Sequence, residues 1–177
     1  PTFFNDYSFE FDGTDDFVST SVTAIPLSLD VSISFWIKAP NQHVHNVVGG
    51  NGIFQYMSIL NNDKLYTNHW TVGWVVLSSG VADGSWHHIV VTFDNATSDL
   101  KTYKDGVLES TNNIPGFSAG NHGITTIGRY GGSAIRFLEG NIDEVSVWGS
   151  ILTSGNITSI YNGGTPNDLT SLSPYGW

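Results

Sequence analysis

The sequence predicts an all-β fold, a two-sheet antiparallel jelly-roll sandwich with one short C-terminal helix. Apolar and polar residues alternate with a period of two in short runs, as in strands that bury one face. Turn-forming residues interrupt these runs at short intervals. One segment near the end of the chain has apolar residues at helical spacing instead. Together these observations favour a β-sandwich with little helix.

The clearest predicted strand spans residues 31–38. Because successive side chains of a strand point to opposite faces, its apolar and polar residues separate onto two faces. One face carries Val31, Ile33, Phe35 and Ile37, and the other carries Ser32, Ser34, Trp36 and Lys38. Pro40 ends the strand, since proline cannot donate to a ladder. Residues 86–93 are apolar almost throughout, which is typical of a strand covered on both faces.

Three turn signals separate the predicted strands. Asp105-Gly106 is the dipeptide that a two-residue hairpin prefers, because both central residues need a positive φ. It would join residues 100–104 to residues 107–111. The other two signals are Asn61-Asn62-Asp63, between residues 53–60 and 64–69, and Asp83-Gly84, between residues 74–77 and the strand that begins at Trp86.

Residues 154–161 predict the one helix, because three of their apolar residues recur at helical spacing. Ser154 is expected to cap its start, and Gly163-Gly164 to end it. We expect residues 1–162 to form the jelly roll. Residues 163–177 lose the alternation, and they predict a C-terminal tail or the start of a further segment.

Composition and charge exclude several classes of function. With 40% hydrophobic residues, the 177-residue chain can bury the core of one domain. Six basic residues against sixteen acidic ones give a net charge of −10, which argues against binding to nucleic acid or to anionic membrane surfaces. No apolar run approaches the ~20 residues that span a bilayer, so no membrane insertion is expected. Without cysteine, the chain has no disulfides and no thiolate zinc sites.

Seven segments resemble the laminin-G-like domains of the concanavalin A-like lectin/glucanase superfamily, in the order that the family has them. They are residues 11–18 (FDGTDDFV), 34–38 (SFWIK), 86–94 (WHHIVVTFD), 103–106 (YKDG), 127–129 (IGR), 140–145 (GNIDEV) and 152–162 (LTSGNITSIYN). The resemblance covers roughly residues 8–162. It implies two antiparallel sheets packed face to face and a glycan- or protein-binding role. Many members carry calcium, and a minority of the superfamily hydrolyses polysaccharides.

The C-terminal part of the chain has a narrower resemblance. Residues 160–169 (IYNGGTPNDL) and 171–174 (SLSP) are similar to laminin-G-like segments in structural proteins of marine bacteriophages. That similarity implies a virion protein whose chain runs on beyond Trp177.

Asp143 is the first candidate site residue. Alternation in residues 142–148 puts its carboxylate on the face of Val145 and Val147, which is expected to be apolar. An ionised carboxylate is costly there unless it is paired or coordinated. The alternative is that this carboxylate accepts backbone N–H bonds where its strand begins.

The family resemblance implies a structural calcium between this last strand and the N-terminal Asp-Gly turn. Its ligands would be Asp12, Asp16 and Asp143, and Asp15 and the Gly13 carbonyl could supply further oxygens of the six to eight that Ca²⁺ prefers. The alternative is that the N-terminal aspartates cap a turn.

An aromatic platform beside hydrogen-bonding groups suits a sugar, because a pyranose has an apolar face ringed by hydroxyls. The candidate ligand-binding residues are Trp70, Trp74, Tyr130, Arg129 and Tyr56. The alternative is that such aromatic residues belong to the core. We expect that role for Trp36, Trp86 and Trp148, which recur in the family pattern as structural residues.

Histidine and carboxylate patterns favour neither zinc nor catalysis. His43 and His45 could share a strand face and His69 could join them, but nothing fixes the three or four converging ligands that zinc needs. Glycoside hydrolysis needs two carboxyls that flank one bond. The chain has no Glu-x-Asp-x-Glu run like that of the superfamily's hydrolases, and we predict that it is not an enzyme.

The sequence therefore predicts a non-catalytic, lectin-like glycan-binding module of an extracellular or virion-surface protein, stabilised by calcium. Binding at each site would be shallow and weak, so presentation in several copies would matter through avidity. The alternative is a structural or decoration element of a virion or surface assembly, whose partner is a neighbouring protein rather than a sugar.

Overall fold

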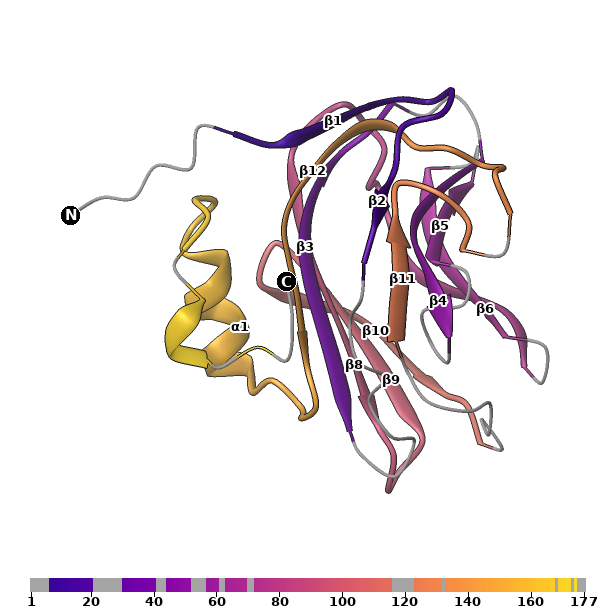
Figure 1. Cartoon of the computed structure of the whole chain (residues 1–177). Coiled ribbons are helices and arrows are strands. Elements are labelled where there is room, and N and C mark those ends of the chain that lie inside the picture. Colours follow the sequence, from indigo (N-terminus) through magenta and orange to yellow (C-terminus); the bar gives the residue numbers. More distant parts are fainter. Residues whose placement is uncertain are drawn as a thin grey trace.

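The strands form two six-stranded antiparallel sheets that pack face to face, and helix α1 lies against the outer face of one of them (Figure 1). This computed structural model describes residues 7–20, 30–40, 44–51, 57–60, 63–69, 72–115, 123–131, 133–167, 169–172 and 174. The predicted all-β jelly-roll sandwich with one short C-terminal helix is confirmed.

The sheet that helix α1 covers is called the first sheet here. Its strand order is β1 (Phe9–Asp12), β12 (Glu139–Trp148), β3 (Val31–Lys38), β8 (His87–Asp94), β9 (Asp99–Lys104) and β10 (Val107–Asn113). The second sheet has the order β2 (Val18–Ser19), β11 (Gly123–Ile127), β4 (His45–Asn51), β5 (Met57–Leu60), β6 (Lys64–His69) and β7 (Gly73–Ser79). The helical elements are α1 (Ser154–Tyr161) and a short 3-10 helix, η2 (Thr170–Leu172).

The side chains of strand β3 alternate between the two faces of the sheet as predicted. Its inward residues lie in the main core between the sheets and are at most 1% exposed: Val31, Ile33, Phe35 and Ile37. Burying each such side chain contributes about 1.5 to 3 kcal/mol. On the opposite face, the Ser32 hydroxyl accepts from the backbone N–H of Leu152 at 3.0 Å, and the Trp36 ring stacks on Tyr161 of α1. This outer face of β3 is therefore the surface on which the C-terminal segment packs.

Strand β12 departs from the predicted alternation at a β-bulge. Asp143 lies opposite Trp36 of β3, whereas Ser146 lies opposite Ser34, so β12 has one residue more than its partner here. Glu144 takes up this residue with a φ of 49°. An extra residue reverses the faces beyond it. The expectation that Asp143 shares the apolar face of Val147 is wrong: Asp143 lies on the outer face, while Val147 lies in the main core.

Helix α1 has the predicted span but a different cap. The Thr153 hydroxyl accepts from the backbone N–H of Asn156 at 3.1 Å, and the side-chain oxygen of Asn156 accepts from the N–H of Thr153 at 3.2 Å. This reciprocal capping box makes Thr153 the N-cap, not Ser154 as predicted. Asn162 ends the helix in the left-handed conformation, just before the predicted stop at Gly163-Gly164.

Helix α1 and the tail bury a second apolar cluster on the outer face of the first sheet. It contains Val90, Trp148, Leu152, Ile157, Ile160 and Leu169. The indole N–H of Trp148 donates to the carbonyl of Leu172 at 3.1 Å, which ties the tail to β12. Among the described residues, no helix is both long and apolar enough to cross a membrane.

The β9–β10 hairpin confirms the predicted two-residue turn. Asp105 and Gly106 both have a positive φ, 51° and 79°. The Asp105 carboxylate also accepts from the backbone N–H of His88 at 2.9 Å, which ties this turn to the start of β8. Asp83-Gly84 lies between β7 and β8, as predicted, whereas residues 61 and 62 of the remaining turn signal lie outside the described residues.

Candidate functional site

Trp74 presents an aromatic surface on the outer face of the second sheet. Its side chain is 48% exposed, and its ring meets that of Tyr66 edge to face, with 6.1 Å between the ring centroids. Val76, two residues along β7, is 40% exposed beside them. Two other predicted ligand residues, Trp70 and Tyr56, lie outside the described residues.

Arg129 and Tyr130 follow β11 and lie far from Trp74. The guanidinium carbon of Arg129 lies 3.7 Å from the centre of the Phe17 ring, a cation–π contact that orients this side chain within the protein. In the second sheet, β4, β5 and β6 separate β11 from β7. Four strand spacings amount to about 19 Å. The structure therefore does not bring Arg129 and Tyr130 together with Trp74 in one site.

The predicted metal ligands are also divided between two places. The carboxylate oxygens of Asp12, Asp15 and Asp16 lie within 4.8 Å of one another on an exposed turn. Asp12 lies opposite Glu139, four residues before Asp143 along β12, which puts Asp143 about 13 Å away. Asp16 thus accompanies Asp12 as expected, but Asp143 does not.

In both places the aspartates accept hydrogen bonds from the backbone. The Asp12 carboxylate accepts from the backbone N–H of Thr14 at 2.8 Å, as a turn-capping aspartate does. The Asp143 carboxylate accepts from the backbone N–H of Glu144 at 2.9 Å, within the bulge. Three acidic groups remain together on the N-terminal turn, where they could offer oxygens to a hard cation.

Two of the described histidines, His45 and His88, are buried. His45 is 1% exposed, and its Nδ1 accepts from the backbone N–H of Glu139 at 3.2 Å, whereas His43 lies outside the described residues. His88 is fully buried and its Nε2 lies 2.8 Å from the Ser34 hydroxyl. Burial lowers the pKa of His88 to about 4, so this ring is neutral near pH 7.

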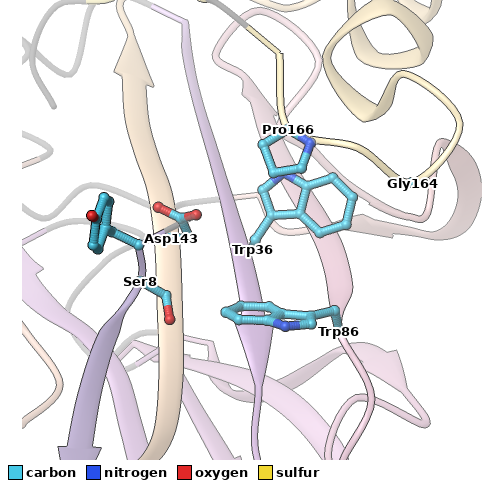
Figure 2. Close-up of a pocket in the computed structure, with 7 residues that line it drawn as sticks. Ser8, Trp36, Trp86, Asp143, Gly164 and Pro166 are labelled. Atoms are coloured by element: carbon cyan, nitrogen blue, oxygen red, sulfur yellow. The ribbon is translucent and has the colours of Figure 1, made fainter. Parts of the chain in front are cut away.

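Aromatic and polar groups also surround a cleft on the outer face of the first sheet. This cleft of about 280 Å³ is lined by Tyr7, Ser8, Trp36, Trp86, Asp143, Gly164 and Pro166. Figure 2 shows the two indole rings on one side of it and the Asp143 carboxylate and the Ser8 hydroxyl on the other. We call this the tryptophan cleft.

Each wall of the tryptophan cleft comes from a different part of the chain. Trp36 projects from β3 and Asp143 from the adjacent position of β12. Trp86 precedes β8, Ser8 precedes β1, and Pro166 belongs to the segment after α1. Figure 2 shows Pro166 among the residues that line the cleft together with Trp36. The cleft exists only when the C-terminal segment folds back over the first sheet.

Packing buries the indole of Trp36 and leaves the indole of Trp86 partly exposed. Trp36 is 4% exposed because its ring stacks on Tyr161 at 5.9 Å and lies 5.0 Å from the ring of His88. Trp86 is 39% exposed, so one of its surfaces is available to a ligand. A rigid ring beside an accessible ring offers a preorganised apolar surface, which costs little entropy on binding.

Sequence reasoning missed this cleft for two physical reasons. Trp36 and Trp86 were expected to be structural, and Trp36 is indeed held by packing, but its position also lines the cleft. Asp143 was expected on the inner face, because a bulge residue such as Glu144 leaves no signal in a period-two pattern. The available signal was Trp86 itself, a tryptophan at the start of a strand rather than within it.

A family model matches most of the chain. Residues 12–158 match a laminin G family, described as the concanavalin A-like lectin/glucanases superfamily. Among solved structures, a heptameric SAP-like pentraxin from Limulus polyphemus is similar, with a TM-score of 0.64 at 16% sequence identity. The match covers 89% of this chain and 83% of the pentraxin chain.

Two longer binding proteins also share the fold. One is a candidate carbohydrate-binding protein from Bacteroides ovatus, with a TM-score of 0.65 at 16% identity over 85% of this chain and 45% of that chain. The other is the binding domain of botulinum neurotoxin serotype D, with a TM-score of 0.64 at 16% identity over 89% of this chain and 43% of that chain. This chain spans less than half the length of either, and at these identities the likeness shows the fold.

Proposed function

The chain belongs to the concanavalin A-like lectin/glucanases superfamily, and from this premise we propose that it is a non-catalytic glycan-binding module. The saccharide binds in the tryptophan cleft. The observation that carries this proposal is the pairing of an accessible Trp86 face with the Asp143 carboxylate and the Ser8 hydroxyl around one hollow. A pyranose needs this combination, because its apolar face stacks on an aromatic ring while its hydroxyls seek hydrogen bonds.

The cleft supports binding rather than hydrolysis. Asp143 is the one carboxylate among the described residues that line it. Glycosidases of the common two-carboxylate type hold a pair on either side of the scissile bond. A small, open cleft also suits one or two sugar units, and several copies on one particle would raise the overall affinity through avidity. We therefore propose presentation outside the cell or on a virion surface.

Replacing Trp86 tests the cleft directly. A multimerised form of the chain, probed on a glycan array, should bind a defined group of glycans. The W86A variant should lose at least about tenfold in affinity for them, because the stacking surface is removed. Titration calorimetry with the best glycan measures the loss.

Trp74→Ala is the matched control, since it removes an exposed tryptophan from the opposite sheet. Full binding by W74A with weak binding by W86A supports the cleft. The reverse result would assign the sugar to the Tyr66–Trp74 surface instead.

A second candidate function is attachment to a neighbouring protein of a virion or surface assembly. The observation that favours it is the exposure of Val107 and Leu108 at the β9–β10 hairpin, 66% and 49%. If the multimerised chain binds no glycan on the array, this candidate is favoured over the first.

Calcium remains part of the proposal, with a changed ligand set. Asp12, Asp15 and Asp16 supply three clustered carboxylates, and Asp143 is left out because the register of β1 and β12 separates it from them. The role of the ion would be structural, since it would brace the turn between β1 and β2.

A further inference from the structure

The charge of the tryptophan cleft narrows the kind of sugar that it takes. Among its described lining residues, Asp143 carries the charge, and the others are aromatic, hydroxyl, glycine or proline residues. The whole chain adds a net charge of −10, whose overall field favours cations over anions. A carboxylate between aromatic walls in a negative field is better suited to a positive ligand than to a neutral one.

The bulge in β12 holds the carboxylate in its place on the cleft wall. Its position opposite Trp36 sets Asp143 beside that ring on the same face of the sheet. The backbone N–H of Glu144 donates to one carboxylate oxygen at 2.9 Å, which restrains the side chain. A preorganised carboxylate loses little freedom when it pairs with a ligand, so this geometry strengthens a charged contact.

The aromatic walls add to this preference. An ammonium group over the face of an indole is attracted by the negative face of the ring system, and tryptophan is the strongest of the aromatic partners. Trp86 offers such a face, and Trp36 adds a second ring that packing holds still. Lys38 is the basic residue closest in register, two residues beyond Trp36 on β3, but its side chain is exposed and does not line the cleft.

We propose that the saccharide recognised in the tryptophan cleft carries a free amino group, which is protonated when it binds. The ammonium pairs with Asp143 and lies against the accessible face of Trp86, while Ser8 contacts the sugar ring. This inference rests on the proposed glycan-binding function and specifies the class of sugar for the same site.

Two oligosaccharides of equal length test whether the cleft selects its ligand by the charge of the amino group. The probes are a β-1,4-linked glucosamine tetramer and its fully N-acetylated counterpart, titrated calorimetrically at a pH below the pKa of the sugar amine. The wild-type chain should bind the free-amine tetramer at least about tenfold more tightly, because only that tetramer forms the charged contact. Added salt should reduce this preference, since salt screens the ion pair.

Asp143→Asn should abolish the preference while leaving the bulge in place, because an asparagine oxygen can still accept from the Glu144 N–H. The matched control is Asp99→Asn, which removes the same charge where β9 begins, opposite Asp94 at the far end of β8. D99N should keep the wild-type preference. A preference lost equally in both variants would mean a general attraction of a polycation to an acidic protein, and it would overturn the inference.

The possible failures are distinguishable. Equal or tighter binding of the N-acetylated tetramer, with affinity lost in W86A, overturns the amino-sugar inference and leaves the glycan-binding proposal intact. Binding of either tetramer that is unaffected by both W86A and D143N overturns the cleft itself. If neither tetramer binds and the array yields only neutral glycans, the amino-sugar inference fails alone. If the chain binds neither tetramer and no glycan on the array, both the glycan-binding proposal and the amino-sugar inference fail.

Discussion

The imidazole of His88 packs against the rings of both Trp36 and Tyr161, with centroid separations of 5.0 and 6.0 Å. Its side chain is fully buried, and its Nε2 lies 2.8 Å from the Ser34 hydroxyl. A charged imidazolium is poorly solvated there, which lowers the pKa of His88 from 6.5 to about 4. This residue therefore supports the floor of the tryptophan cleft only in its neutral form.

Protonation of the His88 ring should contribute to destabilisation of the protein in acid. The unfolded chain takes up a proton near pH 6.5, whereas the folded chain resists it until about pH 4. The stabilisation is thus present in full above pH 6.5 and is lost as the pH falls toward 4. The expected loss in the free energy of unfolding is about 3 kcal/mol, measured by urea denaturation across this range.

His88→Gln provides the comparison, because glutamine keeps a polar group near Ser34 but does not titrate. Carboxylates protonate in both proteins, so the difference between the two curves isolates His88. Parallel curves for the wild type and H88Q from pH 6.5 to 4 would contradict the assignment.

Among the elements, β12 shows how one backbone irregularity changes the face on which a side chain lies. The bulge at Glu144 moves Asp143 to the outer face and returns Val147 to the core, so the same strand serves both the cleft and the sandwich. A regular strand would bury the carboxylate or expose the valine, either of which is unfavourable. The bulge is thus the local feature on which the charged side of the cleft depends.

Helix α1 depends on its cap at Thr153. Thr153→Ala removes the hydroxyl that accepts from the Asn156 N–H, which leaves a helix N-terminal donor without its partner. The free energy of unfolding should fall by about 1 kcal/mol, measured by urea denaturation.

Ser154→Ala is its matched control at the adjacent residue. The backbone carbonyl of Ser154 accepts from the Thr158 hydroxyl, and this contact survives the substitution. S154A should change stability by less than about 0.5 kcal/mol. A larger cost for S154A than for T153A would show that the helix is capped as the sequence pattern predicts.

At the scale of the whole molecule, the two sheets give the chain two separate aromatic surfaces. The tryptophan cleft lies on the outer face of the first sheet, under the C-terminal segment, and the Tyr66–Trp74 surface lies on the outer face of the second. The main core between the sheets keeps these surfaces at a fixed separation. A ligand at one surface therefore leaves the other available to a different partner.

Calcium should stabilise the whole fold if the N-terminal turn binds it, because a ligand that binds only the folded state shifts the unfolding equilibrium. At a calcium concentration a hundredfold above Kd the gain is about 2.7 kcal/mol, which raises Tm by several degrees in a domain of this size. Thermal unfolding with calcium and with a chelator measures it. Asp15→Asn should reduce the gain, and Asp99→Asn should preserve it. An identical Tm with calcium and with chelator would contradict the proposal.

Local patterns in the sequence were sufficient for most of the fold. The alternation of residues 31–38, the Asp105-Gly106 turn and the helix at residues 154–161 each reflect interactions between residues close together in the chain, and the structure confirms all three. The family resemblance agrees with the same architecture, and the family match over residues 12–158 supports it. The helix cap was predicted one residue late, because Thr153 and Ser154 are equally good caps by type and only the side chain of Asn156 distinguishes them.

The candidate site, in contrast, was decided by tertiary structure. Trp36, Trp86 and Asp143 meet because β12 pairs with β3 across more than a hundred residues and because a bulge changes the face of one side chain. The separation of Asp143 from Asp12 depends in the same way on the register of β1 against β12. By itself, the sequence determined which segments become strands and which residues their core buries, since both follow from periodicity. Only the folded chain decided which polar and aromatic groups share a surface, because long-range pairing and register set those distances.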